Sequence, residues 1–350
     1  MTKSGMMEEV STMSDKIHNF ALIGCGAIAK VHIDVIEAVE GARAIGVYDK
    51  NVEFAERFAK EHGIKVFSTM EELLASDAET VAICTPSGLH APLAIRCMEA
   101  GKHVVVEKPI ALTAEDCDRL LEVEKTTGKI CAPISQLRFY EDIRYAKEIL
   151  DGGLLGKPIL CDLYMKYHRS REYYANSSWR GTFAMDGGGA LMNQGIHGVD
   201  VMHFLMGAIE SLNGTVRTQV HDIEVEDTAV ATVRFANGAL GVIEGTTSVQ
   251  SGYPRKLEIH CEKGNMIIVE NKIVALDLPD FEHKEDEQKF DSSSNPMNIS
   301  HKGHTAQYLN FLAALEGREK LFYSATEASA AVKTILAIYQ SSKENRNISL

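Results

Sequence analysis

Two stretches of the chain place side chains that could do chemistry directly after short apolar runs. In "HVVVEKPI", residues 103–110, three valines typical of a buried strand are followed by Glu107 and Lys108. A lysine amine can take part in proton transfer when burial and neighbouring charges lower its pKa. In "TPSGLH", residues 85–90, polar side chains follow another such run. The plain alternative for the Lys-Pro pair is a strand that simply ends in a polar turn.

A glycine pattern lies where the first predicted strand gives way to a helix. "FALIGCGAIAKVH" contains Gly24, Gly26 and Ala29 in the spacing G-x-G-x-x-A. Such a pattern supplies a tight turn, bare backbone that a pyrophosphate can approach, and a helix start with free N–H groups. We therefore expect Gly24 and Gly26, together with Ala27 and Ile28, to bind a dinucleotide. A glycine turn without a ligand is the structural alternative.

A carboxylate at the end of the second predicted strand bears on the choice of dinucleotide. Asp49 follows Gly26 by 23 residues. A carboxylate at this place suits the adenosine ribose hydroxyls and repels a 2′-phosphate, so the sequence favours NAD over NADP. The neighbouring Lys50 leaves some use of NADP open.

The elements that would position these residues alternate between short apolar strands and amphipathic helices. The predicted strands are residues 20–24, 44–49, 80–85, 103–108 and 129–135, and the predicted helices are residues 29–39, 52–62, 70–76, 90–100 and 113–127. This alternation predicts an α/β Rossmann domain, a doubly wound parallel sheet, over residues 19–136. Since the carboxyl ends of parallel strands face the ligand crevice, we expect the cofactor to contact the side chains that follow the strands. These are Thr85, Pro86, His90, Glu107, Lys108 and Gln136.

The order of predicted helices and strands changes after residue 137. Predicted helices at 141–150, 190–205, 306–315 and 325–341 accompany predicted strands at 157–169, 212–218, 227–235, 239–248, 256–261 and 266–274. Strands joined by tight turns, such as "ANG" at 236–238, indicate an α+β domain with an open, mostly antiparallel sheet over residues 137–350. Residues 1–18 are expected to form a disordered tail with no signal peptide, and residues 277–296 a charged loop.

Composition excludes several classes of function. The formal net charge is −13, from 36 basic and 49 acidic residues, which disfavours binding to nucleic acid. Seven scattered cysteines without a C-x-x-C spacing predict reduced thiols in a cytoplasmic protein. The pair His301 and His304 has no acidic partner at ligand spacing, so no metal is expected. No apolar run is long enough for a membrane span.

Together, GCGAIA, TPSGLH, EKP and "DGGGALMNQGIHGVDVMHFLMG" (186–207) resemble the glucose–fructose oxidoreductase/inositol dehydrogenase (Gfo/Idh/MocA) family along essentially the whole chain. The resemblance implies a dehydrogenase that acts on CH–OH groups, with Lys108 as its catalytic lysine. The family's acid-x-x-x-His pair falls on Asn193 and His197, and the spacing of four places both on one helical face. Asn193 replaces the commoner aspartate and cannot take a proton, so it can only orient its partners.

A further run, "YHRSREYYANSSWRGTFAMDGGGALMNQGIH", resembles a branch that oxidises nucleotide-sugar acids, the UDP-N-acetylglucosaminuronate 3-dehydrogenases. "QLRFY", at 136–140, occupies the place of a polar segment in that branch. A single tryptophan beside an arginine can stack on nicotinamide or sugar, so we expect this of Trp179 and Arg180, or else that they seat a loop. The basic residues expected to contact the substrate are Arg138, Arg169 and Arg171, with a solvated loop as the alternative for the last two.

The expected reaction is reversible hydride transfer between nicotinamide and a secondary hydroxyl of a sugar, nucleotide-sugar or cyclitol. Removing the hydroxyl proton requires a group poised near neutral pH, which favours His197 as the base and Lys108 as the group that polarises the oxygen. The reversed assignment stays open. The alternatives are an inositol or simple-sugar dehydrogenase and, from another class, a non-catalytic NAD-binding regulatory protein. The family resemblance also implies a homodimer or homotetramer.

Overall fold

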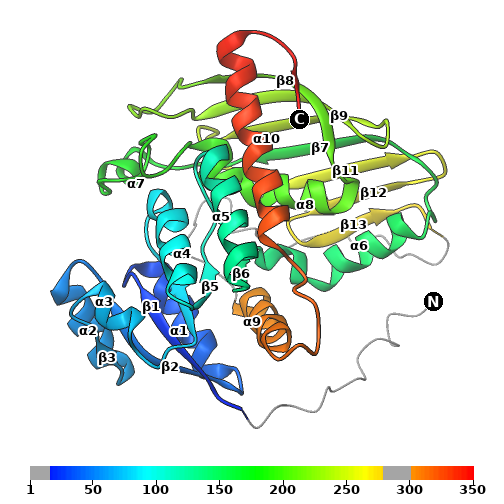
Figure 1. Ribbon diagram of the computed structural model, residues 1–350. Helices are drawn as coiled ribbons and strands as arrows, with labels where there is room; N and C mark the ends of the chain where they lie inside the picture. Colours follow the sequence, from blue (N-terminus) through cyan, green and yellow to red (C-terminus); the bar gives the residue numbers. More distant parts are fainter. Residues whose placement is uncertain (1–15, 279–300) are drawn as a thin grey trace.

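The computed structural model describes residues 16–278 and 301–350, arranged around two β-sheets (Figure 1). Most of the predicted tail 1–18 and of the predicted loop 277–296 lies outside the described residues. Along these residues, no helix combines the length and the apolar character that crossing a membrane would require.

The first sheet is parallel throughout, as predicted, and has the strand order β3-β2-β1-β4-β5-β6. Its strands are β1 (His18–Ile23), β2 (Ala42–Tyr48), β3 (Lys65–Val66), β4 (Thr80–Ile83), β5 (His103–Val106) and β6 (Cys131–Pro133). The sequence did not predict β3, which is only two residues long. The order reverses between β1 and β4, and such a switch point is where open α/β sheets bind ligands, outside the carboxyl ends of the strands.

Helices cover both faces of this sheet. They are α1 (Ala27–Ala38), α2 (Val52–His62), α3 (Met70–Leu74), α4 (His90–Glu99) and α5 (Ala114–Thr127). Phe20 and Leu22 of β1 pack with α1, whereas Ala21 and Ile23 face the opposite core with α4 and α5. Asn51 accepts a hydrogen bond from the backbone N–H of Phe54 and so caps α2 at its start.

The second sheet is mixed and mostly antiparallel, with the order β13-β12-β11-β7-β10-β9-β8-β14. Its strands are β7 (Pro158–Lys166), β8 (Ile209–Arg217), β9 (Thr228–Phe235), β10 (Leu240–Thr246), β11 (Lys256–Cys261), β12 (Asn265–Val269), β13 (Lys272–Leu276) and β14 (Ile348–Ser349). Among the described strands of this second sheet, only β7 and β10 pair in parallel. The single strand predicted at 266–274 is wrong, because Glu270 takes a φ of 52° and turns the chain into a β12–β13 hairpin.

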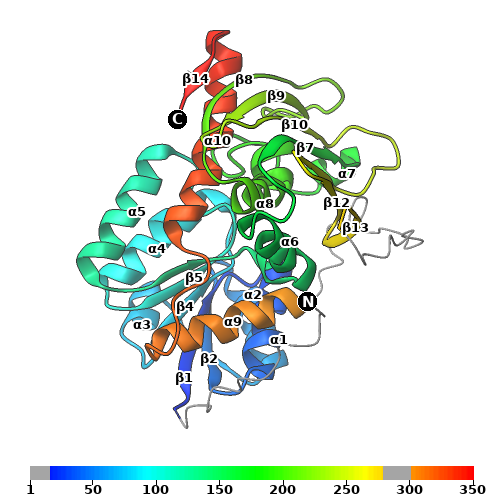
Figure 2. The ribbon, with the colours of Figure 1, turned by 90° about the vertical axis from the view of Figure 1, so that its right-hand side faces the viewer.

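Three helices cover one face of the second sheet (Figure 2). They are α6 (Glu141–Asp151), α8 (Ile196–Met206) and α10 (Ala325–Glu344), while the short α7 (Arg171–Ala175) lies near the end of β7. The predicted helix over 190–205 begins as a π-helical turn, η3 (Ala190–Gly195). The carboxylate of Glu226 accepts the backbone N–H groups of Gly189 and Leu191 and thereby holds the start of this turn.

The last part of the chain returns to the first sheet. Helix α9 (His301–Leu315) inserts Tyr308, Phe311 and Leu312 against Phe20 and Ile33. By sequence this helix belongs to the predicted second domain, but in space it completes a layer of the first. The predicted boundary at residue 136 follows chain order and stays a prediction.

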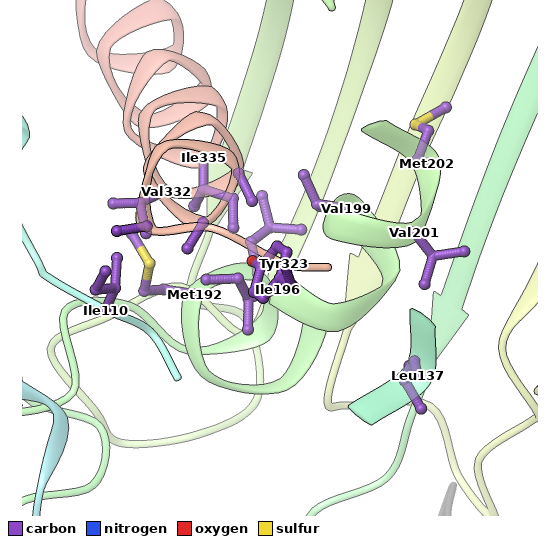
Figure 3. Close-up of a cluster of buried hydrophobic side chains, with 14 of the residues drawn as sticks. Ile110, Leu137, Met192, Ile196, Val199, Val201, Met202, Tyr323, Val332 and Ile335 are labelled. Atoms are coloured by element: carbon purple, nitrogen blue, oxygen red, sulfur yellow. The ribbon is translucent and has the colours of Figure 1, made fainter. Parts of the chain in front are cut away.

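The two sheets share one apolar core. Figure 3 shows Ile110, which follows β5, beside Met192 of η3 and Val332 of α10, with Leu137 and Ile196 on the side of α8. All five side chains are nearly inaccessible to solvent. Burial on this scale fixes the carboxyl edge of the first sheet against η3 and α8, which carry Asn193 and His197.

Candidate active site

The glycine turn after β1 forms an open cradle. Gly24 has a φ of +96°, and a Cβ there would lie 2.7 Å from the carbonyl oxygen of Cys84, so only glycine fits. At Gly26 an added Cβ would meet no described atom within 4 Å, which leaves room in front of the helix. No side chain of the described residues caps α1, so its first N–H groups point into that space. Ala27 is exposed and Ile28 half-buried at the same helix start.

Asp49 stands beside this cradle. Its two carboxylate oxygens accept the backbone N–H groups of Cys25 and Asn51, each at 2.8 Å, which fixes the carboxylate at the end of β2. After β4 and β6, at the same carboxyl edge of the sheet, Thr85 Oγ1 and Gln136 Oε1 are buried atoms without a hydrogen-bond partner among the described residues. An open helix start, a fixed carboxylate and unsatisfied polar atoms along one edge fit a bound NAD.

His90, which was expected to contact the cofactor, lies between two loops. Its ring is 1% exposed, with Nδ1 2.7 Å from the carbonyl oxygen of Pro109 and Nε2 2.8 Å from that of Thr85. Both ring nitrogens are therefore engaged by the backbone, and the histidine ties the TPSGLH loop to the EKP turn. The expected direct contact of His90 with the cofactor stays a prediction, and what the structure shows is a histidine that links two loops.

Glu107 also points away from the crevice. It is 6% exposed, and Oε1 lies 3.0 Å from His32 Nε2 and 3.8 Å from His304 Nε2. These contacts with the two rings hold the pKa of Glu107 well below its usual range despite burial, which acts in the opposite direction. The predicted cofactor contact of Glu107 is thus replaced by a buried contact with α1 and α9.

The fold supplies His304 with the acidic neighbour that the sequence spacing lacked. His32, Glu107 and His304 offer three potential ligand atoms within 4.8 Å of one another. His32 Nδ1 is 2.6 Å from the hydroxyl of Tyr308, so Tyr308 can donate to it while His32 Nε2 donates to Glu107. Hydrogen bonds thus account for His32 and Glu107 without an ion, and the expectation that no metal binds stays a prediction.

Lys108 projects from the end of β5 onto η3. Its Nζ donates to the backbone carbonyl of Asn193 at 2.8 Å and lies 3.5 Å from Asn193 Oδ1. Burial lowers the pKa of Lys108, the charges of Arg169 and Arg180 act in the same direction, and Glu107 and Asp186 oppose them. The amine is therefore closer to neutrality than an exposed lysine.

His197 lines the same small cavity as Lys108, together with Ser135, Ile196 and Tyr323. Its imidazole makes no hydrogen bond with the part of the chain that is described. Burial and the nearby Lys108 ammonium hold the pKa of His197 well below its usual value, so the ring is neutral at pH 7. The sequence predicted that Lys108, after β5, and His197, at the start of α8, would converge, and both side chains line one cavity.

The predicted α-helical spacing of Asn193 and His197 is wrong in detail. Asn193 lies in the π-helical turn and His197 in the α-helix that follows, so a separation of four residues does not stack them on one face. Asn193 is nevertheless 8% exposed beside Lys108, and its amide nitrogen donates to Asp186. The wider turn directs the Asn193 side chain to Asp186 and Lys108.

Arg138 was expected to contact substrate, but the structure buries its side chain among other partners, so this contact stays a prediction. Its guanidinium is 2% exposed and donates to both carboxylate oxygens of Asp200, at 2.9 and 2.6 Å, and to Glu327 at 2.5 Å. The rings of Phe204 and Tyr323 lie on it, at 4.8 and 4.4 Å from the guanidinium carbon. With these partners, Arg138 joins η2 (Gln136–Phe139) to α8 and α10 as a buried structural cation.

Arg169 and Arg180 do lie near the cavity. The Arg169 side chain is buried and donates to the amide oxygen of Gln194 through Nε and Nη2, at 3.1 and 2.7 Å. Arg180 stacks on Tyr173, with its guanidinium carbon 4.2 Å from the ring centre, and on Trp179 at 5.5 Å. Arg180 Nε is buried without a hydrogen-bond partner among the described residues.

Trp179 therefore packs against the guanidinium of Arg180. Arg171, the first residue of α7, is exposed. Neither is shown to contact a ligand, so the expected contacts of Trp179 and Arg171 stay predictions.

Sequence reasoning missed two residues that the structure places in this network. Asp186 is 1% exposed and accepts hydrogen bonds from Asn193 and from the backbone N–H of Gly181. Gln194 bonds to Arg169, Asn193 and the hydroxyl of Tyr173. Both belong to the DGGGALMNQ run; a lone acid directly before three glycines could have pointed to Asp186, whereas no such signal marks Gln194.

Comparisons with known proteins agree with this geometry. Residues 18–134 match the model of the oxidoreductase family with an NAD-binding Rossmann fold, and residues 143–267 match that of the GFO/IDH/MocA C-terminal domain. The chain is 30% identical over 259 residues to the scyllo-inositol 2-dehydrogenase (NAD(+)) of Bacillus subtilis, which covers 71% of this chain and 72% of that protein. It is 27% identical over 344 residues to the inositol 2-dehydrogenase of Rhizobium meliloti, covering 95% and 98%.

Among solved structures, the fold is similar to the WlbA dehydrogenase of Bordetella pertussis in complex with NADH and UDP-GlcNAcA. The TM-score is 0.88 at 30% identity, over 97% of this chain and 99% of that one. The two matched domain models, the identities and this similarity over nearly the whole chain agree with the GCGAIA, EKP and MNQGIH motifs. The chain therefore belongs to the GFO/IDH/MocA family of NAD-binding oxidoreductases.

Proposed function

We propose that this oxidoreductase converts a secondary hydroxyl of a sugar that carries an anionic group into a ketone, reversibly. The observation that carries the proposal is that Lys108 and His197 line one cavity at the carboxyl edge of the NAD-binding sheet. The cofactor would be held by the turn at Gly24 and Gly26 and by Asp49, and when bound it supplies the acceptor for the hydride.

The proton is handled by this chain's own residues. His197 is proposed as the base, since a neutral imidazole is ready to accept the hydroxyl proton at pH 7. The Lys108 ammonium is proposed to polarise the same oxygen. Because the pKa of His197 lies well below 6.5, any kinetic ionisation seen above pH 7 is expected to belong to Lys108.

The charge of the site supports an anionic substrate. Lys108, Arg169 and Arg180 are close enough that the two arginines lower the pKa of the lysine. In a chain with a net charge of −13, this local excess of cations favours a carboxylate or phosphate on the substrate. A nucleotide-sugar acid meets this requirement, and UDP-GlcNAcA is the ligand named for the WlbA dehydrogenase of Bordetella pertussis.

An inositol or simple-sugar dehydrogenase is the second candidate. Its support is the similarity to the inositol dehydrogenases of Bacillus subtilis and Rhizobium meliloti. Neutral cyclitols would leave Arg180 Nε without a partner, which is why we place this candidate second.

The test is an assay of NADH formation with UDP-linked uronic acids, the corresponding neutral UDP-sugars, and inositols. We expect turnover with an acid and at least a hundredfold loss in Lys108→Ala and in His197→Ala. The exposed residues Lys125 and His301 provide matched alanine controls that keep full activity. Turnover of an inositol but of no sugar acid would select the second candidate, and full activity in either site variant would refute the assigned role.

The outer face of the second sheet is proposed to bind a second copy of this chain. No described helix covers this face, where Leu160, Val230, Leu240 and Val242 lie beside one another in the register of β7, β9 and β10. Val230 and Leu240 are 48% and 58% exposed. We expect a homodimer or homotetramer by light scattering, and Leu240→Glu is expected to dissociate it.

The cytoplasm is the proposed location. Its support is the seven cysteines, which are all free thiols and of which six are buried.

A further inference from the structure

A carboxylate lies directly behind the amide of Asn193. Asp186 Oδ2 accepts the backbone N–H of Gly181 at 2.8 Å, and Oδ1 accepts the amide nitrogen of Asn193. Because an ionised carboxylate only accepts hydrogen bonds, the amide nitrogen must face Asp186 and the amide oxygen must face the other way. On that other side lie the Lys108 ammonium, 3.5 Å from Asn193 Oδ1, and the donating Nε2 of Gln194, at 3.2 Å.

The charges around the lysine give this arrangement a second effect. The pKa of Asp186 is raised to about 6 by burial, so the group is ionised at pH 7 and above. Of the acids that act on Lys108, Glu107 already faces two histidine rings on the far side. The charged or titratable groups facing Lys108 are His90, Glu107, Arg169, Arg180, Asp186 and His197, and those facing Asp186 are Lys108, Tyr174, Arg180 and Tyr339.

We propose that Asp186 is a positioning residue for the reaction, which acts on Lys108 through Asn193. It orients the amide oxygen toward the ammonium, and it supplies the negative charge that offsets Arg169 and Arg180. The inference rests on the proposed function, since it concerns the same lysine.

The first variant to test is Asp186→Asn. The side-chain oxygen of the new asparagine accepts the Gly181 N–H, so the amide nitrogen at position 186 faces Asn193. The Asn193 amide must then present its oxygen to position 186 and its nitrogen to Lys108. We expect the pH dependence of Lys108 reductive methylation by formaldehyde and borane to move down by about one pH unit. With a sugar substrate, kcat is expected to fall roughly tenfold while KM changes less than about twofold.

The double variant Asp186→Asn/Asn193→Asp restores the charge. The new carboxylate at position 193 accepts hydrogen bonds from Lys108 and from the amide nitrogen at position 186. The amide oxygen at position 186 accepts the Gly181 N–H, so each of these hydrogen bonds is kept. We expect the methylation curve to return to the wild-type position or to move above it, because the charge is now nearer to the amine. The exposed Asp118, which pairs with Lys333, gives a matched Asp→Asn control that leaves the curve unchanged.

Peptide mass spectrometry measures the Lys108 curve directly and needs no substrate. An unmoved curve in Asp186→Asn with wild-type melting and NAD affinity would overturn the inference. The inference would also be overturned if Asp186→Asn lost activity without a shift of the methylation curve and the double variant did not restore that activity. Such a result is expected of an aspartate whose role is structural. If the single variant does not fold, the double variant decides alone, and a curve that lies below the wild-type position there is the refuting result. Absence of turnover with every sugar acid would instead refute the proposed function, with the methylation curves still readable.

Discussion

Replacing Arg138 by alanine tests whether this arginine serves the fold, as its contacts indicate, or the substrate, as its position in the sequence suggested. The substitution removes one partner of a fully buried pair and leaves the Asp200 carboxylate, 3% exposed, without its cation. Breaking such a pair typically costs about 3–5 kcal/mol, because the remaining charge stays buried. It also removes the two aromatic contacts of the guanidinium, with Phe204 and Tyr323.

The expected change in melting temperature follows from the length of the chain. At about 2.1 cal/mol/K per residue, 350 residues give an unfolding entropy of roughly 0.7 kcal/mol/K. A loss of about 3–5 kcal/mol then lowers Tm by about 4–7 °C. The neighbouring Arg144 is exposed and provides the control, for which the expected change in Tm is below about 1 °C.

The assay is differential scanning calorimetry combined with kinetics well below Tm. We expect KM for the sugar to stay within about twofold, because Arg138 has no exposed donor to offer. Replacing Arg138 by Met and Asp200 by Asn together removes both charges and is expected to recover part of the lost stability. An unchanged Tm with a KM raised tenfold or more would refute this reasoning and return Arg138 to the substrate site.

Three further predictions concern the cofactor turn and a buried histidine. Gly24→Ala is expected to abolish NAD binding, measured by NADH fluorescence. The reason is that the added Cβ would lie 2.7 Å from the carbonyl oxygen of Cys84, at a φ of +96°. Retained affinity would show that this turn does not bind the cofactor. Asp49→Ser is expected to lower KM for NADP relative to NAD about tenfold or more, and an unchanged ratio of kcat/KM would contradict the role of the carboxylate. Burial lowers the pKa of His203 to about 4, so the unfolded chain binds the extra proton between about pH 6.5 and 4, and stability falls as pH decreases through that window. His203→Gln, which can keep a bond to Thr334, is expected to reduce this acid loss by up to about 2 kcal/mol in urea unfolding at pH 4.5 relative to pH 7.

The first sheet could be predicted because its determinants are local. The valines of β5, the glycine turn after β1 and the Gly128 cap of α5 each act within a few residues, and the observed φ of Gly128 is 66°. The predicted elements there agree with the structure to within a few residues. Only β3 was not predicted, because a strand of two residues is too short to show an alternation of apolar and polar side chains.

The partners of buried charges could not be predicted, because they come from distant parts of the chain. Arg138 finds Asp200 62 positions later, and Glu107 finds a ring at His32 and another at His304. The π-helical turn at Asn193 depends in the same way on Glu226, which binds the backbone before it. The motifs and the family resemblance predicted Lys108 and His197 as reacting groups, and the fold shows which neighbouring groups contact them and shift their pKa values.

The return of helix α9 to the first sheet has a consequence for biosynthesis. Phe20 and Ile33 are made first, but Tyr308 and Phe311, which cover them, leave the ribosome only after strands β7 to β13 have been synthesised. Until then the nascent nucleotide-binding half exposes an apolar stripe that only a chaperone or a still-unmade helix can shield. Cutting a gene fragment at the end of β6 would therefore yield an insoluble half, and a stable mini-domain would need residues 301–315 grafted back.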